Sequence, residues 1–124
     1  MIDMAIVGGG LAGGLIALAV HRAHPEMRLA LFESGDVFGG NHRWSWFDSD
    51  LDAAGKALLA NCRQVEWNQG YEVRFPDIAR TLTSTYHSIA SRDFDADLRR
   101  ELPQETLRLL SPVADIAPDG VTLG

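Results

Sequence analysis

Gly8, Gly10 and Gly13 fit the pattern G-x-G-x-x-G, between an apolar run that predicts a strand and a longer one that predicts a helix. In this pattern the first glycine forms a tight turn, the second lets the backbone approach a pyrophosphate, and the third lets the helix lie against the strand. The helix N-terminus offers free N–H groups and a partial positive charge. We therefore expect Leu11 and Ala12 to bind a pyrophosphate together with these glycines.

An acidic residue follows at the distance that this pattern needs. Glu33 lies 20 residues after Gly13, at the end of the second apolar run. A carboxylate there can accept hydrogen bonds from ribose hydroxyls, and it would repel a 2′-phosphate, so the site is predicted to hold FAD or NAD rather than NADP. No Lys followed by Ser or Thr ends the glycine run, which excludes a P-loop. The alternative is a glycine turn that binds nothing.

A second glycine pair follows the acidic residue. Gly39 and Gly40 precede Asn41 and His42, an arrangement that resembles flavoproteins of the glutathione-reductase type more than simple NAD dehydrogenases. In such flavoproteins this segment runs back over the cofactor, so Gly40, Asn41 and His42 are expected to contact it. The alternative is an ordinary surface turn. His42 could face the flavin or the substrate, or it could be structural.

Two tryptophans come next, two positions apart. If the segment is extended, Trp44 and Trp46 share one face. They then form either a stacking surface for a flavin or a flat apolar substrate, or a part of the core. The sequence leaves both interpretations open.

Alternating strands and helices are predicted to position these motifs. Residues 3–7 and 28–33 predict buried strands, and residues 11–24 a helix ended by Pro25, which together make a βαβ unit. Further elements are predicted as follows: a helix over 51–61 capped by Asp48 or Asp50, strands over 71–75, 81–89 and 107–110, a helix capped by Ser91 and ended by Pro103, and a hairpin of 113–117 with 121–123. The expected fold class is α/β, a Rossmann-like FAD/NAD(P)-binding fold of the glutathione-reductase type.

Length and composition limit the class of protein further. The 124 residues are 46% hydrophobic, which suits one globular domain. The net charge of -6, with basic residues scattered, predicts no nucleic-acid partner. The apolar stretch 11–20 is too short to span a bilayer and lacks the preceding basic residues of a secretory signal. The lone Cys62 suits a reducing cytoplasm and is expected to be inert.

The remaining acidic residues predict no metal site. Asp48, Asp50 and Asp52 imitate the start of a calcium loop, but Ala53 and Leu59 stand where a glycine and a bidentate Glu are needed. Helix capping and solvation are the expected roles of these acids. Three further acids are expected to be solvated and two arginines to form an exposed helix turn: Asp93, Asp95, Asp97, Arg99 and Arg100.

Several longer strings are more specific than the glycine pattern. They are residues 7–12 with 14–18, the string GGNH-x-W-S from Gly39, the string Y-x-V-R-F-P from Tyr71, and Tyr86 with Ser88, Ile89, Ser91 and Phe94. Together they resemble bacterial lycopene β-cyclases, over residues 3 to 110. Related flavoproteins share the glycine pattern, whereas the two quoted strings are far more specific to this family.

The resemblance implies a flavin-dependent isomerase of carotenoid biosynthesis that closes the ψ ends of lycopene, or of a related acyclic carotenoid, into β-ionone rings. In the family an acid protonates the terminal double bond, the cation closes the ring, and loss of a proton completes it. Reduced FAD is required without net redox change, and NADPH is the reductant. An anionic reduced flavin in a dry pocket can stabilise the cation. Because lycopene resides in lipid, we expect a cytoplasmic protein that attaches peripherally to the inner membrane.

The acidic segment credited with the general acid in this family lies downstream of the cofactor-binding part. No position here matches it, so no catalytic residue is assigned and we expect this chain alone to be inactive. We expect residues 1–124 to be the N-terminal part of a single FAD-binding domain, with the substrate and catalytic region beyond residue 124. The alternatives are a FAD-dependent oxidoreductase or monooxygenase on the same fold, and a non-catalytic dinucleotide-binding module.

Overall fold

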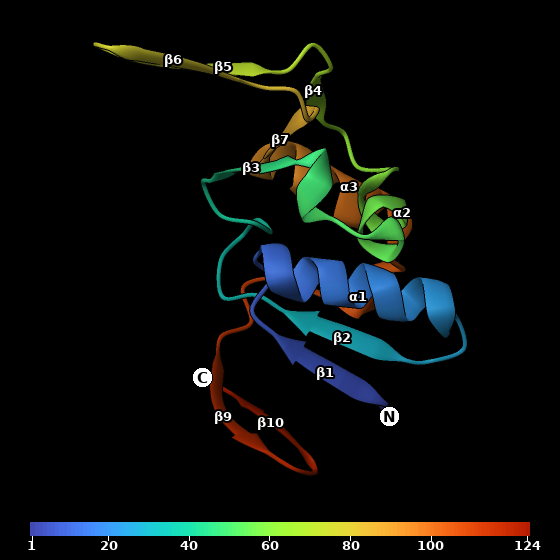
Figure 1. The fold of residues 1–124 in the computed structure, drawn as a ribbon. Coiled ribbons are helices and arrows are strands. Elements are labelled where there is room, and N and C mark those ends of the chain that lie inside the picture. The colour runs from blue at the N-terminus through green and yellow to red at the C-terminus, as the bar shows by residue number, and fades with distance from the viewer.

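The computed structural model describes residues 1–124 and begins with the predicted βαβ unit (Figure 1). Its elements are β1 (Met4–Val7), α1 (Leu11–Ala23) and β2 (Leu29–Phe32). β1 and β2 pair in parallel, from Met4 with Leu29 to Val7 with Phe32. β8 (Leu107–Arg108) pairs in parallel with the other edge of β2, so the sheet order is β1-β2-β8. The predicted unit and the later parallel strand are confirmed, although β8 is shorter than predicted.

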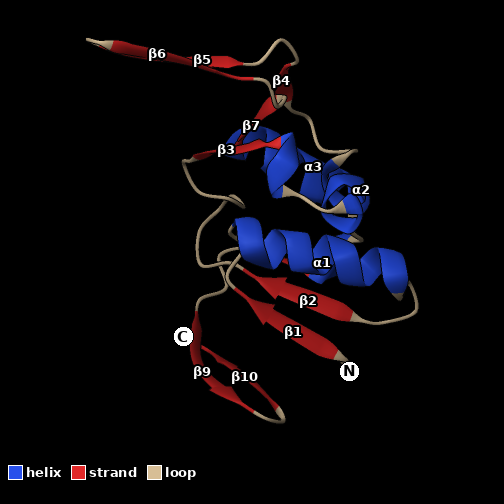
Figure 2. Cartoon of the chain, in the orientation of Figure 1, coloured by secondary structure: helices blue, strands red, loops and turns tan.

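A second layer of elements covers the side of α1 that faces away from the parallel sheet (Figure 2). β3 (Arg43–Phe47), β7 (Tyr86–Ala90) and β4 (Val65–Trp67) form an antiparallel sheet in the order β3-β7-β4. α2 (Ala53–Leu59) and α3 (Ser91–Glu101) both pack against α1, and α3 also packs against β7. Two short 3-10 helices, η1 (Asp48–Asp50) and η2 (Gln104–Thr106), complete the connections.

Two hairpins extend from these layers. β5 (Tyr71–Phe75) and β6 (Ile78–Leu82) form an antiparallel pair that projects beyond the β3-β7-β4 sheet (Figure 1). β9 (Val113–Ala117) and β10 (Gly120–Leu123) form the other pair, as predicted. The chain is thus an α/β protein with parallel and antiparallel sheets, compatible with a Rossmann-like domain. None of its helices has the length and apolar character that crossing a membrane requires.

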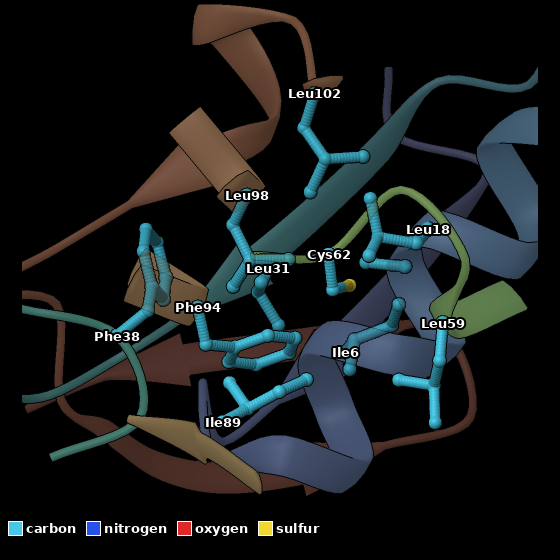
Figure 3. Close-up of a cluster of buried hydrophobic side chains, with 11 residues drawn as sticks. Ile6, Leu18, Leu31, Phe38, Leu59, Cys62, Ile89, Phe94, Leu98 and Leu102 are labelled. Carbon is cyan, nitrogen blue, oxygen red and sulfur yellow. The ribbon is translucent and has the colours of Figure 1, made fainter. Parts of the chain in front are cut away.

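The hydrophobic core joins α1, α3 and the parallel sheet (Figure 3). Leu18, Leu31, Phe94 and Leu98 are fully buried in it. α1 and α3 approach each other at Gly14, where an ideal Cβ atom would lie 2.6 Å from Cζ of Phe94. A larger residue at this position would push the two helices apart, since packed interiors have no spare volume.

Cys62 lies in the same core and is buried, in agreement with its predicted inertness. Burial raises the pKa of its thiol to about 11, and the nearby carboxylates of Asp97 and Glu101 add to the effect. Because the thiolate is the reactive form, this sulfur has little nucleophilic character at neutral pH.

Asp97 contradicts the expectation that the acids of residues 93–97 are solvated. Its side chain is fully buried, accepts a hydrogen bond of 2.7 Å from the N–H of Arg63, and is paired with Arg100. Asp95 also has a structural role, because its Oδ1 accepts from the N–H of Phe38 at 2.8 Å. The alternation of these acids predicted solvent exposure, but Asp95 and Asp97 accept hydrogen bonds from backbone N–H groups of distant loops. A carboxylate that is paired and hydrogen-bonded in this way can be buried.

Two predicted boundaries are wrong. The predicted strand 81–89 is two strands, since β6 pairs with β5 whereas β7 pairs with β3 and β4. Ser91 was expected to cap α3 but is its first residue. Its Oγ instead accepts a hydrogen bond of 3.1 Å from the N–H of His42, which fixes the loop before β3.

The start of α2 also differs from the prediction. Its N-cap is Asp52, whose Oδ1 accepts from the N–H of Gly55 at 2.8 Å. Asp48 is bound instead to Lys56 and to the buried ring of His87, and Asp50 accepts from the N–H of Phe47. All three acids therefore have structural partners, but only Asp52 caps the helix.

Replacing Asp52 with Ala is expected to lower the free energy of unfolding by about 1 kcal/mol, because an orphan N–H of the first helical turn loses its acceptor. Asp52→Asn retains a side-chain oxygen and should leave the stability close to that of the wild type. Urea unfolding of the two variants measures the difference. An equal loss in both variants would contradict the capping role, because charge alone would then explain it.

Candidate functional site

The glycine turn joins β1 to α1 at the carboxyl edge of the parallel sheet. Gly8 has a φ of +99°, a left-handed conformation that favours glycine, and its N–H donates to the carbonyl of Phe32 at 2.8 Å. An ideal Cβ atom on Gly13 would lie 1.9 Å from the carbonyl oxygen of Gly8. The roles predicted from the pattern for these two glycines, a tight turn and close packing of helix on strand, are confirmed.

Gly10 lies between them and has open space around it. Its φ is -75°, and an ideal Cβ atom there would meet nothing within 4 Å. The N–H groups of Gly10, Ala12 and Gly13 donate to no protein acceptor. Leu11 is half-buried with its side chain against the core, so only its backbone can serve a ligand. Free N–H donors, the positive end of the helix dipole and unfilled space make this turn suitable for a diphosphate.

Glu33 lies directly beside this turn. Its Oε2 accepts from the N–H of Gly9 at 2.9 Å, and its Oε1 accepts from the N–H of Gly35 at 2.8 Å and from the hydroxyl of Ser34 at 3.2 Å. A carboxylate has about four acceptor positions, and three are used here. One acceptor position therefore remains for a ligand, and a ribose hydroxyl is a suitable partner for it.

The hydrogen bonds to Glu33 favour its charged form. The N–H of Gly35, followed by that of Gly9 and the donors of Ser34, holds the pKa of Glu33 below its ordinary value of 4.5, although partial burial opposes this. A lowered pKa in the folded state adds stability at neutral pH, and this contribution is lost as the pH falls through the folded-state pKa.

Glu33→Gln is therefore expected to be less stable than the wild type at about pH 7, and the difference should shrink as the pH falls below 4.5. Urea midpoints measured at neutral and acidic pH test this. Glu105→Gln is the matched control, because Glu105 is exposed and has no hydrogen-bond partner. A difference between Glu33→Gln and wild type that stays constant with pH would contradict the assigned role of the charge.

The segment after β2 returns to the glycine turn. Gly39 has a φ of +75°, and its N–H donates to the carbonyl of Gly9 at 2.7 Å. Gly40 also has a positive φ of +62°. The N–H groups of Gly40 and Asn41 have no protein acceptor, and Gly40, Asn41 and His42 are exposed. The structure thus brings this segment to the glycine turn, with its polar groups available to a ligand.

The two tryptophans of β3 pack toward the helices. Trp44 lies edge-on to Phe94 with ring centroids 5.6 Å apart, and Trp46 stacks on His87 at 5.2 Å. Both rings are half-buried and pack against the core, which supports the core interpretation. The prediction that they share one face of an extended segment is confirmed.

Sequence reasoning missed one residue of this site, Gly9, and the contact that Gly39 makes with it. Gly9 donates to Glu33, and an ideal Cβ atom on it would lie 2.5 Å from Cδ1 of Phe38. Gly39 connects the second glycine pair to the turn. The uninterrupted run of three glycines was a signal for Gly9, because the standard pattern needs no glycine at its second position.

This arrangement can bind an anion at the start of α1 and a sugar hydroxyl at Glu33, which fits a dinucleotide such as FAD. No three His, Cys, Asp or Glu side chains come close enough together to hold a metal ion. The fold and site define an α/β protein whose first βαβ unit is built like a dinucleotide-binding one. A family model described as "Lycopene cyclase protein" matches residues 3–123, and the chain belongs to this family.

Curated relatives agree with the family assignment. The chain is 42% identical over 123 residues to a lycopene beta-cyclase of Pseudescherichia vulneris, covering 99% of this chain and 31% of that protein. It is 36% identical over 121 residues to a lycopene beta-cyclase of Pantoea ananas, covering 98% of this chain and again 31% of the relative. A lycopene beta-cyclase of a Paracoccus species is 40% identical over 87 residues, covering 70% of this chain and 22% of the relative. The chain thus spans about a third, or less, of the length of these relatives.

Proposed function

We propose that the full-length protein is a lycopene β-cyclase that converts the ψ ends of lycopene, or of a related acyclic carotenoid, into β-ionone rings. The observation that carries this proposal is the match of nearly the whole chain to relatives named lycopene beta-cyclase. The geometry of the glycine turn supports it, since it suits the dinucleotide cofactor that such an enzyme would use.

We propose FAD, in its reduced form, as the cofactor, bound in a fold of the glutathione-reductase type, with NADPH as the reductant. The free N–H groups of Gly10, Ala12 and Gly13 would bind the pyrophosphate, and Glu33 would accept a ribose hydroxyl. The unpartnered N–H groups of Gly40 and Asn41 would donate to the same cofactor, with His42 beside them. When bound, the reduced flavin would supply negative charge near a cationic substrate.

The substrate also bears on where the protein would act. Because an acyclic carotenoid dissolves in lipid and not in water, we propose that the enzyme works in the cytoplasm, at the surface of the inner membrane. Flotation of the full-length protein with liposomes measures this attachment. A protein that turns over its substrate equally well without any lipid or detergent would contradict it.

Product analysis tests the proposed reaction. The full-length protein is incubated with lycopene in liposomes, FAD and NADPH, and the carotenoids are analysed by chromatography and mass spectrometry. We expect a product with the mass of lycopene and with β-ionone rings. A reaction with oxidised flavin and no reductant is the control and should give none. A product with altered hydrogen or oxygen content would identify a redox enzyme on the same fold instead.

A further inference from the structure

Four aromatic side chains form a cluster on the outer face of the β3-β7-β4 sheet. The aromatic cluster consists of Phe47, Trp67, Tyr71 and Tyr86, with ring centroids 5.0 Å apart for Phe47 and Tyr86, 5.3 Å for Tyr71 and Tyr86, and 5.6 Å for Trp67 and Tyr86. Trp44 and Trp46 alternate with Phe47 along β3 and point to the opposite face. The cluster therefore lies away from the core, and Trp67 and Tyr71 are 46% and 45% exposed.

The aromatic cluster continues along one face of the β5–β6 hairpin. Side chains two apart on a strand share a face, and cross-strand partners share it too. From Tyr71 this rule defines the hairpin face, which adds four apolar residues: Val73, Phe75, Ile78 and Leu82. Arg80 is its one charged member, whereas the other face carries Glu72, Arg74, Ala79 and Thr81. Phe75 and Ile78, at the end of the hairpin, are each 66% exposed.

One strand connects this apolar surface to residues 39–42, the segment proposed to contact the cofactor. β3 starts at Arg43, directly after His42, and runs to Phe47 in the aromatic cluster. In the view of Figure 1 the hairpin projects toward the side on which α1 begins and on which the chain passes from β2 to β3. The aromatic cluster and the hairpin face thus extend outward from the β3-β7-β4 sheet. Its strand β3 directly follows residues 39–42 in the chain.

From this placement we propose that the aromatic cluster and the hairpin face bind the polyene chain of the carotenoid substrate. This inference rests on the proposed function and adds the surface that would hold the substrate. A long apolar chain needs an extended apolar surface with few polar groups, and rigid aromatic rings provide large contact areas. A five-residue strand extends roughly 16 Å, so the hairpin and the cluster together suit an elongated ligand.

Charge argues against a lipid bilayer as the occupant of this surface. Residues 71–82 contain two acidic and two basic residues, Glu72, Asp77, Arg74 and Arg80, and Arg74 is paired with Glu72 at 2.5 Å. Attraction to anionic headgroups requires an excess of basic residues near the apolar surface. The hairpin has no such excess, whereas an uncharged polyene needs none.

Photo-crosslinking in the full-length enzyme identifies the occupant directly. The photoreactive residue p-benzoylphenylalanine is placed at position 75 in place of Phe75, and the flavin-loaded protein is irradiated in liposomes that contain lycopene. We expect a covalent adduct with the mass of lycopene. The same residue at position 81, in place of Thr81 on the other face, is the control and should give no such adduct. An adduct with a phospholipid acyl chain, or a crosslink to another segment of the protein, would overturn the proposal.

Kinetics provide a second, independent readout. Phe75→Ala and Tyr71→Ala should each raise the KM for lycopene at least about tenfold, the equivalent of about 1.4 kcal/mol, with flavin content unchanged. Thr81→Ala should leave KM unchanged. Wild-type KM in both aromatic variants would overturn the proposal even if ring closure proceeds. Failure of the unmodified enzyme to form β-ionone rings is a different result, because it would contradict the proposed reaction. A lycopene adduct at position 75 would still support the proposed binding surface.

Discussion

Gly10→Val is expected to abolish flavin retention in the full-length enzyme while leaving its fold intact. A side chain at Gly10 would point into space that the protein leaves empty, since nothing lies within 4 Å of an ideal Cβ atom there, and the backbone has a φ of -75° that valine adopts readily. The pyrophosphate is expected to occupy that space, so the two isopropyl methyls would exclude it. We expect affinity for FAD to fall at least about 100-fold.

Visible flavin absorbance of the purified variant measures the loss, and urea unfolding of the apoproteins checks that stability is preserved. Gly120→Val is the matched control, because an ideal Cβ atom on Gly120 also meets nothing within 4 Å but lies in the β9–β10 hairpin. A Gly10→Val enzyme that copurifies with as much flavin as wild type would show that the pyrophosphate binds elsewhere.

Gly13→Ala is expected to act on the fold itself and to lower the free energy of unfolding by about 3 kcal/mol. The added Cβ would lie 1.9 Å from the carbonyl oxygen of Gly8, and distances under 3.0 Å are essentially never found. The clashing atom belongs to the backbone of a turn that is itself fixed to Phe32, so α1 would have to move off β1. Flavin binding would then be lost as a secondary effect.

Gly55→Ala provides the contrast for this prediction. Gly55 lies in α2, where the nearest atom to an ideal Cβ is the flexible Cδ2 of Leu51 at 3.3 Å. The higher helix propensity of alanine should leave stability unchanged or raise it slightly. Urea unfolding compares the two variants, and similar stability for Gly13→Ala and Gly55→Ala would refute the close packing of α1 on the turn.

The first βαβ unit could be predicted from the sequence because its signals are local. A buried strand, a run of glycines, a helix stopped by Pro25 and a second buried strand follow each other without ambiguity. The bounds in the structure differ from the predicted ones by at most one residue. The division of residues 81–89 into β6 and β7 could not be predicted. No glycine or proline stands between the two strands, and their separation follows from pairing with different partners far away in the sequence.

In the candidate site, too, features set by neighbouring residues could be predicted, whereas contacts between distant segments could not. The positions of Glu33 and of the glycines follow from the pattern, whereas the hydrogen bond from Gly39 to Gly9 depends on how the chain returns after β2. Burial of Asp97 was equally hidden, because its donors come from Arg63 and from a helix neighbour, Arg100. Trp44 and Trp46 were placed on one face correctly, but only the position of α3 and of His87 decides what that face contacts.

The buried sulfur of Cys62 offers a use beyond its place in the core. A thiol that is 4% exposed and has a pKa of about 11 reacts slowly with maleimides and with Ellman's reagent. Its rate of labelling therefore reports how often the contacts among α1, α2 and α3 open transiently, without any engineered probe. Because Cys62 reacts slowly, a fluorophore can be attached preferentially through a cysteine introduced at Ile78. Its signal would then follow the motion of the β5–β6 hairpin.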